Sequence, residues 1–149
     1  MSNTKNEQEY QLENKETYID SNLLIYSVID IGEKGEKARK VIEKIKDGDY
    51  KAYTSTLTLD EVMWIVQNQK DKETAYESAK TIMDIPNLHF ISVNIETIMK
   101  ALEIYNKNKL NPRDSIHLAA IKEKNLKMIM SSDSDFDKIE DLKRIDFTK

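Results

Sequence analysis

The sequence predicts a single α/β domain in which a central parallel sheet of short strands is flanked by helices. Short apolar segments alternate along the chain with segments of helical period, a pattern typical of parallel sheets covered by helices. The length of 149 residues suits one domain with its own hydrophobic core. The chain has no cysteine, which excludes disulfides, zinc–thiolate sites and thiol catalysis.

The expected strands are short and rich in apolar or β-branched residues. The segment that follows Lys127 is apolar without polar alternation, which indicates a strand buried on both faces. The strands are expected at residues 17–19, 50–54, 88–91, 127–130 and, as a possible last strand, 144–147. Residues 1–15 have no apolar periodicity, so we expect a loosely ordered polar tail ahead of a domain at residues 16–149.

Helices are expected between these strands. Gly48 and Pro86 mark two helix ends, and Pro112 suits the first turn of a helix capped by Asn111. After a helix start at Ser21, the helices are expected at residues 36–46, 55–67, 71–84, 94–107 and 112–124. Two of them have apolar stripes that we expect to face the core, namely Leu59, Val62, Met63 and Val66 in one and Ile95, Ile98, Met99, Leu102 and Tyr105 in the other.

The charge distribution is uneven. The net charge is −4, yet residues 93–129 hold seven lysines and arginines against four acids. These bases are either a solvated helix surface or a rim that faces phosphate. The polar N-terminus does not resemble a signal peptide, and the apolar stretch at residues 23–31 is too short to cross a bilayer. We therefore expect a cytoplasmic protein that does not enter membranes.

Four carboxylates lie where expected strands give way to helices: Asp20, Glu61, Asp114 and Asp133. Each has a purely structural explanation. Asp20 and Asp133 suit helix N-caps, Thr58 and Glu61 have the spacing of a capping box, and Asp114 lies in a first helical turn, where negative charge is favourable.

The four together favour another explanation. In parallel α/β sheets, ligands bind beyond the carboxyl ends of the strands, where the strand order reverses. Several carboxylates in one crevice repel each other unless a cation lies between them. Carboxylate oxygens with ordered water suit Mg²⁺ or Mn²⁺, so the residue pattern indicates a site for a hard divalent cation.

The segments around these acids resemble the motifs of PIN domains, in the order that the family has them. Residues 18–26 (YIDSNLLIY) resemble the opening strand and helix, and the segment from Thr54 to Val62 resembles the second acidic motif. Residues 113–120 (RDSIHLAA) resemble the third motif, and residues 130–137 (MSSDSDFD) resemble the fourth. The resemblance extends from about Tyr18 to the C-terminus. Among PIN domains, a small stand-alone chain of this length is most similar to VapC-type toxin ribonucleases.

The resemblance implies a ribonuclease that hydrolyses RNA phosphodiester bonds with Mg²⁺ or Mn²⁺. It assigns Asp20, Glu61, Asp114 and Asp133 as catalytic and metal-binding residues, with Asp135 as a further metal ligand. It also implies that Ser131 forms a hydrogen bond within the site, an antitoxin protein as partner, and a homodimer. The alternative is a catalytically weak PIN-like module that binds RNA or protein.

Three other side chains have less certain roles. Arg113 precedes Asp114 at a helix start, where it either contacts substrate phosphate or moderates the acidic cluster. His117 lies one helical turn after Asp114, and we expect a partly buried histidine with a structural role, with a hydrogen bond to substrate as the alternative. We expect Trp64 to pack in the core or in an interface, with stacking on unpaired bases as the alternative.

Overall fold

The computed structural model describes residues 16–149, so the polar tail expected at residues 1–15 lies outside the described residues. The strands are β1 (Glu16–Ile19), β2 (Lys51–Ser55), β3 (Leu88–Ile91), β4 (Met128–Met130) and β5 (Lys143–Ile145). The helices are α2 (Ser21–Ile29), α3 (Glu33–Lys46), α4 (Thr56–Gln69), α5 (Lys72–Met83), α6 (Ile95–Asn108) and α7 (Pro112–Glu123), with a 3₁₀ helix η1 (Ser134–Lys138).

All five strands form one parallel sheet in the order β3-β2-β1-β4-β5, which confirms the predicted fold class. The chain first builds one half of the sheet outward from β1, then returns to place β4 on the other side of β1. Strand order therefore reverses between β1 and β4. The sheet is paired there through Tyr18 with Ile129 and Ile19 with Met130.

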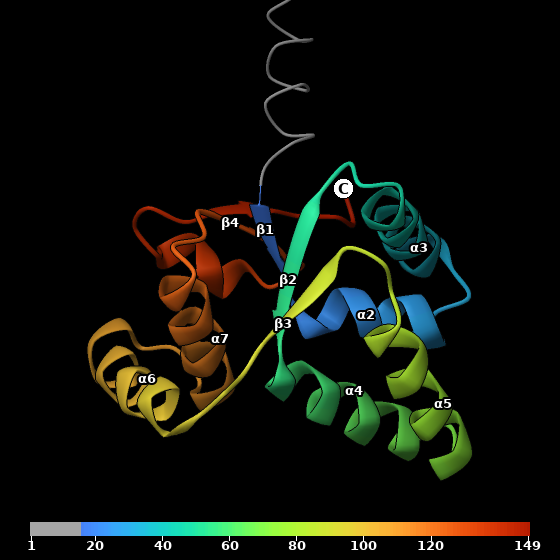
Figure 1. Cartoon of the computed structure of the whole chain (residues 1–149), viewed down its shortest axis with the longest axis horizontal. Helices are drawn as coiled ribbons and strands as arrows, with labels where there is room; N and C mark the ends of the chain where they lie inside the picture. Colours follow the sequence, from blue (N-terminus) through green and yellow to red (C-terminus); the bar gives the residue numbers. More distant parts are fainter. Residues whose placement is uncertain (1–15) are drawn as a thin grey trace, which may run out of the picture.

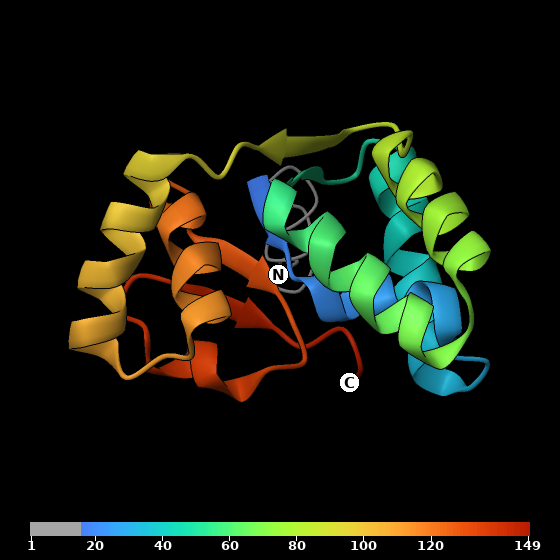
Figure 2. The same ribbon diagram turned by 90° about the horizontal axis from the view of Figure 1, so that it is seen from below.

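Helices cover both faces of the sheet, as Figures 1 and 2 show: α6 and α7 lie on one side, and α2 to α5 lie on the other. Side chains of neighbouring strand residues alternate between two cores. Ile19 and Met130 pack in the core beneath α2 to α5, whereas Tyr18 and Ile129 pack in the core beneath α6 and α7. Strands β1 and β4 are thus buried on both faces at their C-terminal ends, where the site residues follow.

The signals at several helix ends act as the sequence predicts. Asp20 is the N-cap of α2 and accepts a hydrogen bond from the Ser21 amide. Pro112 is the first residue of α7, and Gly48 follows α3 with a φ of 83°. The Asn94 side chain accepts from the Thr97 amide, so that α6 begins with a capping box.

Three expectations about helices are wrong. The stripe on α6 does not face the core, because Ile95, Met99 and Leu102 are 61–66% exposed while Ala101 and Ile104 are buried. In α4, Met63 is also partly exposed, although Val62 and Val66 are buried as expected. Helix α3 begins at Glu33, three residues before the expected start.

Two large aromatic side chains lie outside the core, which leaves an interface or stacking on bases as the expected roles of Trp64. Trp64 is 55% exposed and Tyr105 is 51% exposed, so neither packs in the core of this chain. Tyr26, by contrast, packs against the core, with its ring centroid 6.1 Å from that of Phe147. Among the described residues, no helix is both long enough and apolar enough to cross a membrane.

Candidate functional site

The site residues collect at the point where strand order reverses. Asp20 directly follows β1, while Ser131 and Asp133 follow β4, the strand paired with β1. The Asp20 amide donates to the carbonyl of Met130 at 3.1 Å, which joins the two strand ends. Helix α7 brings Asp114 to the same edge, where its carboxylate lies close to that of Asp133. The location is where parallel α/β sheets bind ligands.

Asp20 is buried, and neighbouring polar groups surround its carboxylate. Oδ1 accepts from the Ser21 amide at 2.8 Å, and Oδ2 accepts from the Ser131 hydroxyl at 2.5 Å and from Asn22 Nδ2 at 3.3 Å. Burial raises the pKa of Asp20 even though His117 and the hydrogen bond from Ser131 act in the opposite direction. These hydrogen bonds hold the Asp20 carboxylate in one orientation, while its burial disfavours the charged form.

Glu61 lies on α4 and contacts two groups from other elements. Its Oε2 accepts from the Ser21 hydroxyl at 3.1 Å, and its Oε1 lies 2.6 Å from His117 Nε2. Thr58, which has capping-box spacing to Glu61, lies within the helix and is hydrogen-bonded to Thr54 at 2.7 Å. The expectation of a capping box is therefore wrong, because α4 begins earlier, at Thr56.

His117 is part of the site rather than a partly buried structural residue, which corrects the expectation from the sequence. It is 1% exposed, and its Nδ1 lies 2.6 Å from the hydroxyl of Tyr18 while its Nε2 faces Glu61 and, at 3.7 Å, Asp20. Burial by itself lowers the pKa of His117, but Tyr18, Glu61 and Asp20 outweigh it and raise the pKa well above the ordinary value. The ring thus lies between two carboxylates that favour its protonated form.

Three carboxylates form a second group beside this one. Oxygens of Asp114, Asp133 and Asp135 lie within 4.8 Å of one another, a spacing that a bound metal ion permits. Burial, Asp133 and Asp20 raise the pKa of Asp114 to about 7, although His117 acts in the opposite direction. Asp133 also caps η1 by accepting from the Asp135 amide at 2.9 Å. Capping and cation binding are therefore compatible uses of one residue.

The chemistry of the donor set fits a hard divalent cation. The three clustered groups are carboxylates, and their mutual repulsion is relieved when a cation lies between them. Beside Asp20, the Oδ1 of Asn22 is buried and has no hydrogen-bond partner within residues 16–149. Buried unpaired acceptors are uncommon and indicate a place for water or an ion.

The structure places Ser131 inside the site and Arg113 at its margin. Ser131 donates to Asp20 and accepts from the Asp133 amide at 2.9 Å, so it links the segments after β1 and β4. Arg113 is an exposed residue of the first turn of α7. The sequence did not single out Tyr18, Ser21 or Asn22. Only the position of Ser21 and Asn22 next to Asp20 hinted at a role.

A comparison with models of protein families identifies the domain. The model of the PIN domain matches residues 17–142. The chain belongs to the PIN domain family. Its membership confirms the resemblance inferred from the four motifs, and the described fold is that of a single PIN domain. No curated protein is similar enough in sequence to match this PIN domain.

Solved structures similar in fold include toxins of VapBC systems. VapBC2 from Rickettsia felis, bound to a promoter DNA fragment, matches with a TM-score of 0.68 at 13% identity over 87% of this chain and 97% of the other. VapC20 from Mycobacterium tuberculosis, a toxin that cleaves the sarcin–ricin loop, matches with a TM-score of 0.68 at 12% identity over 81% and 92%. VapBC-1 from Haemophilus influenzae matches at 0.65 and 16% identity over 90% and 99%.

Proposed function

We propose that this PIN domain is a divalent-metal-dependent endoribonuclease and the toxin of a toxin–antitoxin pair. The observation that carries the proposal is the group of Asp114, Asp133 and Asp135, whose oxygens lie close enough to share an ion, next to the buried Asp20 at the switch point of the sheet. Bringing these carboxylates together is unfavourable in the absence of a cation. A metal-binding role accounts for their arrangement.

In this proposal Asp114, Asp133 and Asp135 hold Mg²⁺ or Mn²⁺, and Asp20 contributes from the end of β1. When bound, the metal lowers the pKa of a water molecule and offsets charge on the scissile phosphate. Ser131 holds Asp20 in orientation through its hydroxyl, and His117 holds Glu61. In this proposal the affinity for the metal comes chiefly from the three clustered aspartates. Glu61 contacts His117 and Ser21 rather than these aspartates.

The proposed partners rest on the similar structures. Several are toxins in complex with their antitoxins, and VapC20 is a toxin that cleaves the sarcin–ricin loop. We propose RNA as the substrate, an antitoxin protein as the inhibitor, and a homodimer as the assembly. The exposed apolar side chains on α4, α5 and α6 provide surface for protein contacts, among them Trp64, Tyr76 and Met99.

Cleavage of structured RNAs tests the enzymatic part. The purified protein is incubated with RNA in Mg²⁺, Mn²⁺ or EDTA, in parallel with Asp20→Asn, Asp114→Asn and the matched control Asp60→Asn, which changes an exposed aspartate next to Glu61. We expect cleavage only with metal, a loss of about 100-fold or more in the two site variants, and no loss in the control. Equal cleavage in all samples would refute the proposal.

One observation favours a second function, a catalytically weak module that binds RNA or protein. Both oxygens of Glu61 are already engaged, one by His117 and one by Ser21. A carboxylate held in this way is less free to bind metal or water. Folded protein that cleaves no RNA with either metal, but still binds RNA or a protein partner, would support the module.

A further inference from the structure

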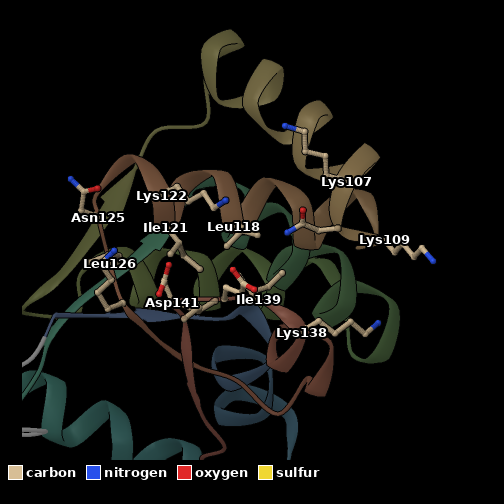
Figure 3. A pocket seen from close by; sticks show the side chains of 14 residues that line it. Lys107, Lys109, Leu118, Ile121, Lys122, Asn125, Leu126, Lys138, Ile139 and Asp141 are labelled. Atoms are coloured by element: carbon tan, nitrogen blue, oxygen red, sulfur yellow. The ribbon is translucent and has the colours of Figure 1, made fainter.

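A groove on the α6–α7 side of the domain has a lining that the metal site does not explain. It has a volume of about 770 Å³ and lies between the C-terminal ends of α6 and α7 and the segment from η1 to β5. Figure 3 shows Lys107, Lys109 and Lys138 toward one end, and Asn125 and Leu126 toward the other. Its floor is apolar, formed by Leu118, Ile121 and Ile139 among others.

The rim of this groove is strongly basic. Five lysines line it against two acids, Glu140 and Asp141, a local charge of +3 in a chain whose net charge is −4. The lysines are Lys107, Lys109, Lys122, Lys127 and Lys138. Four of them come from the basic segment at residues 93–129. The fold therefore brings to one groove lysines that could be assigned from the sequence only to a general basic helix surface.

The backbone around the groove departs from ordinary conformations. Lys109, Asn125 and Asp141 have positive φ angles of 53°, 52° and 62°, and all three residues line the groove. Lys109 ends α6 in the left-handed conformation that glycine usually occupies there. A lysine at such a position carries a conformational cost, and strain of this kind is often found at functional sites.

One lysine of the groove also contacts the acidic cluster. Lys138 on its rim lies 3.4 Å from Asp135, one of the three clustered aspartates. Helix α7 has Asp114 in its first turn and Lys122 in its last. Eight residues of helix separate them, which is about 12 Å along the axis. Lys122 and the groove therefore lie along α7 from the acidic cluster, at a distance that a few nucleotides can span.

We propose that this groove binds the phosphate backbone of a single strand of RNA on its way to or from the acidic cluster. The proposal rests on the nuclease function and names the path of its substrate. Lysines bind phosphates as point charges. No aromatic side chain lines the groove within the described residues, so it offers no stacking platform for bases. The lysines therefore supply affinity without sequence selectivity.

Binding without cleavage tests the groove. A labelled single-stranded oligouridylate is titrated in EDTA between about 50 and 200 mM salt. One variant replaces Lys107, Lys122 and Lys127 by Gln, and a matched variant replaces the exposed Lys44, Lys70 and Lys72, which lie on α3, at the end of α4 and on α5. Both variants lose three positive charges, so a difference between them reports position rather than net charge.

We expect the groove variant to bind at least about tenfold more weakly than the parent. The slope of log affinity against log salt should become shallower by about 0.7 for each phosphate that the variant no longer neutralises. The matched variant should stay close to the parent in both respects. Equal affinities and salt slopes for the two variants would overturn the proposal, as would a parent protein that does not bind the oligonucleotide at low salt.

Lys109 allows a second test in which loss of folding cannot mimic the result. Lys109→Gly removes a charge at a positive-φ position that glycine tolerates better, so we expect the midpoint of thermal unfolding to rise by about 2 °C while RNA affinity falls. Unchanged affinity in Lys109→Gly would count against the groove. Because EDTA suppresses metal chemistry, a failure of the proposed nuclease function shows only in the cleavage assay and is separate from these results.

Discussion

At the scale of single residues, a buried histidine stabilises the carboxylates of the site. His117 is buried and contacts Tyr18, Glu61 and Asp20, and its raised pKa favours a protonated ring beside two acids that have little contact with solvent. Removing one member of a buried charged group leaves the others uncompensated, which is strongly destabilising. The ring therefore contributes to stability as well as to the orientation of Glu61.

We predict that His117→Gln lowers the free energy of unfolding by about 2–4 kcal/mol in EDTA at neutral pH, because Glu61 and Asp20 lose the buried ring that faces them. Urea denaturation measures the change. The matched control is His89→Gln, which alters the exposed histidine on β3 and should change stability by less than about 0.5 kcal/mol. Similar losses in both variants would contradict this role of His117.

Asp114 gives a prediction about pH. Its pKa is raised from an ordinary value of 3.8 to about 7, so between these values the folded protein binds more protons than the unfolded chain. The contribution of Asp114 to stability is therefore present at low pH and is lost as pH rises through this window. Unfolding in EDTA from about pH 4 to 8 should show a steeper decline in the parent than in Asp114→Asn.

The exposed Asp60 provides the control for this titration. Asp60→Asn should keep the steep decline of the parent, since Asp60 lies outside the cluster. A parent protein whose stability changes with pH in the same way as that of Asp114→Asn would show that Asp114 is not perturbed.

The residues of the site were only partly predictable from the sequence. Acids at the ends of strands can be recognised locally, because the pattern of an apolar strand followed by Asp is short. The partners of His117 lie 99 residues away in the case of Tyr18 and 56 in the case of Glu61. A histidine one turn after Asp114 has the same local pattern whether it faces solvent, the core or the site, so its role depends on the tertiary fold.

At the scale of elements, the junction of α2 and α3 depends on a glycine within a helix. Gly35 lies in the first turn of α3, and its amide donates to Asp30 Oδ2 at 2.6 Å. A methyl group at this position would overlap the backbone carbonyl of Asp30. Arg39 also donates to that carbonyl, at 2.9 Å, so the carbonyl is not free to move away.

We predict that Gly35→Ala destabilises the protein by about 1–3 kcal/mol, the cost typical of overpacking. The sign is informative, because alanine in place of glycine within a helix ordinarily stabilises by about 1 kcal/mol. Lys44→Ala, at an exposed position of the same helix, should be nearly neutral. Thermal unfolding of both variants measures the difference, and a stabilised Gly35→Ala protein would refute the steric argument.

The orientation of α6 shows a limit of helical periodicity. The stripe of large apolar residues predicts that one face of the helix is buried, yet the structure buries the face with Ala101 and Ile104 against α7 and exposes Met99 and Leu102. Two helices that pack closely favour small residues where they meet. A hydrophobic pattern indicates which face of a helix is apolar. It does not determine whether that face packs against the rest of the same chain.

At the scale of the whole molecule, the acidic cluster implies a balance between stability and metal binding. Asp114 comes from α7, whereas Asp133 and Asp135 come from the segment after β4. An ion bound to all three would therefore link these two parts of the folded chain. A ligand that binds only the folded state stabilises by about 2.7 kcal/mol at about 100 times its Kd. Without the ion, the same residues repel.

We predict that the order of stabilities reverses with metal. In EDTA at about pH 8, Asp114→Asn should unfold at a higher temperature than the parent, because it removes like-charge repulsion. In saturating Mn²⁺ the parent should unfold at the higher temperature, since it alone keeps the complete cluster. Asp60→Asn should follow the parent in both conditions. The same order of the two proteins in EDTA and Mn²⁺ would refute a metal site at Asp114.

The strand order has a consequence for synthesis of the chain. Asp20 is made early, but the hydroxyl that holds it belongs to Ser131, 111 residues later, and β4 must pair with β1 before the two meet. A growing or prematurely released chain that ends before β4 lacks Ser131, Asp133 and Asp135 altogether. The acidic cluster can thus assemble only after residues 131–135 have been synthesised, so any nascent chain that ends before β4 lacks the proposed metal site.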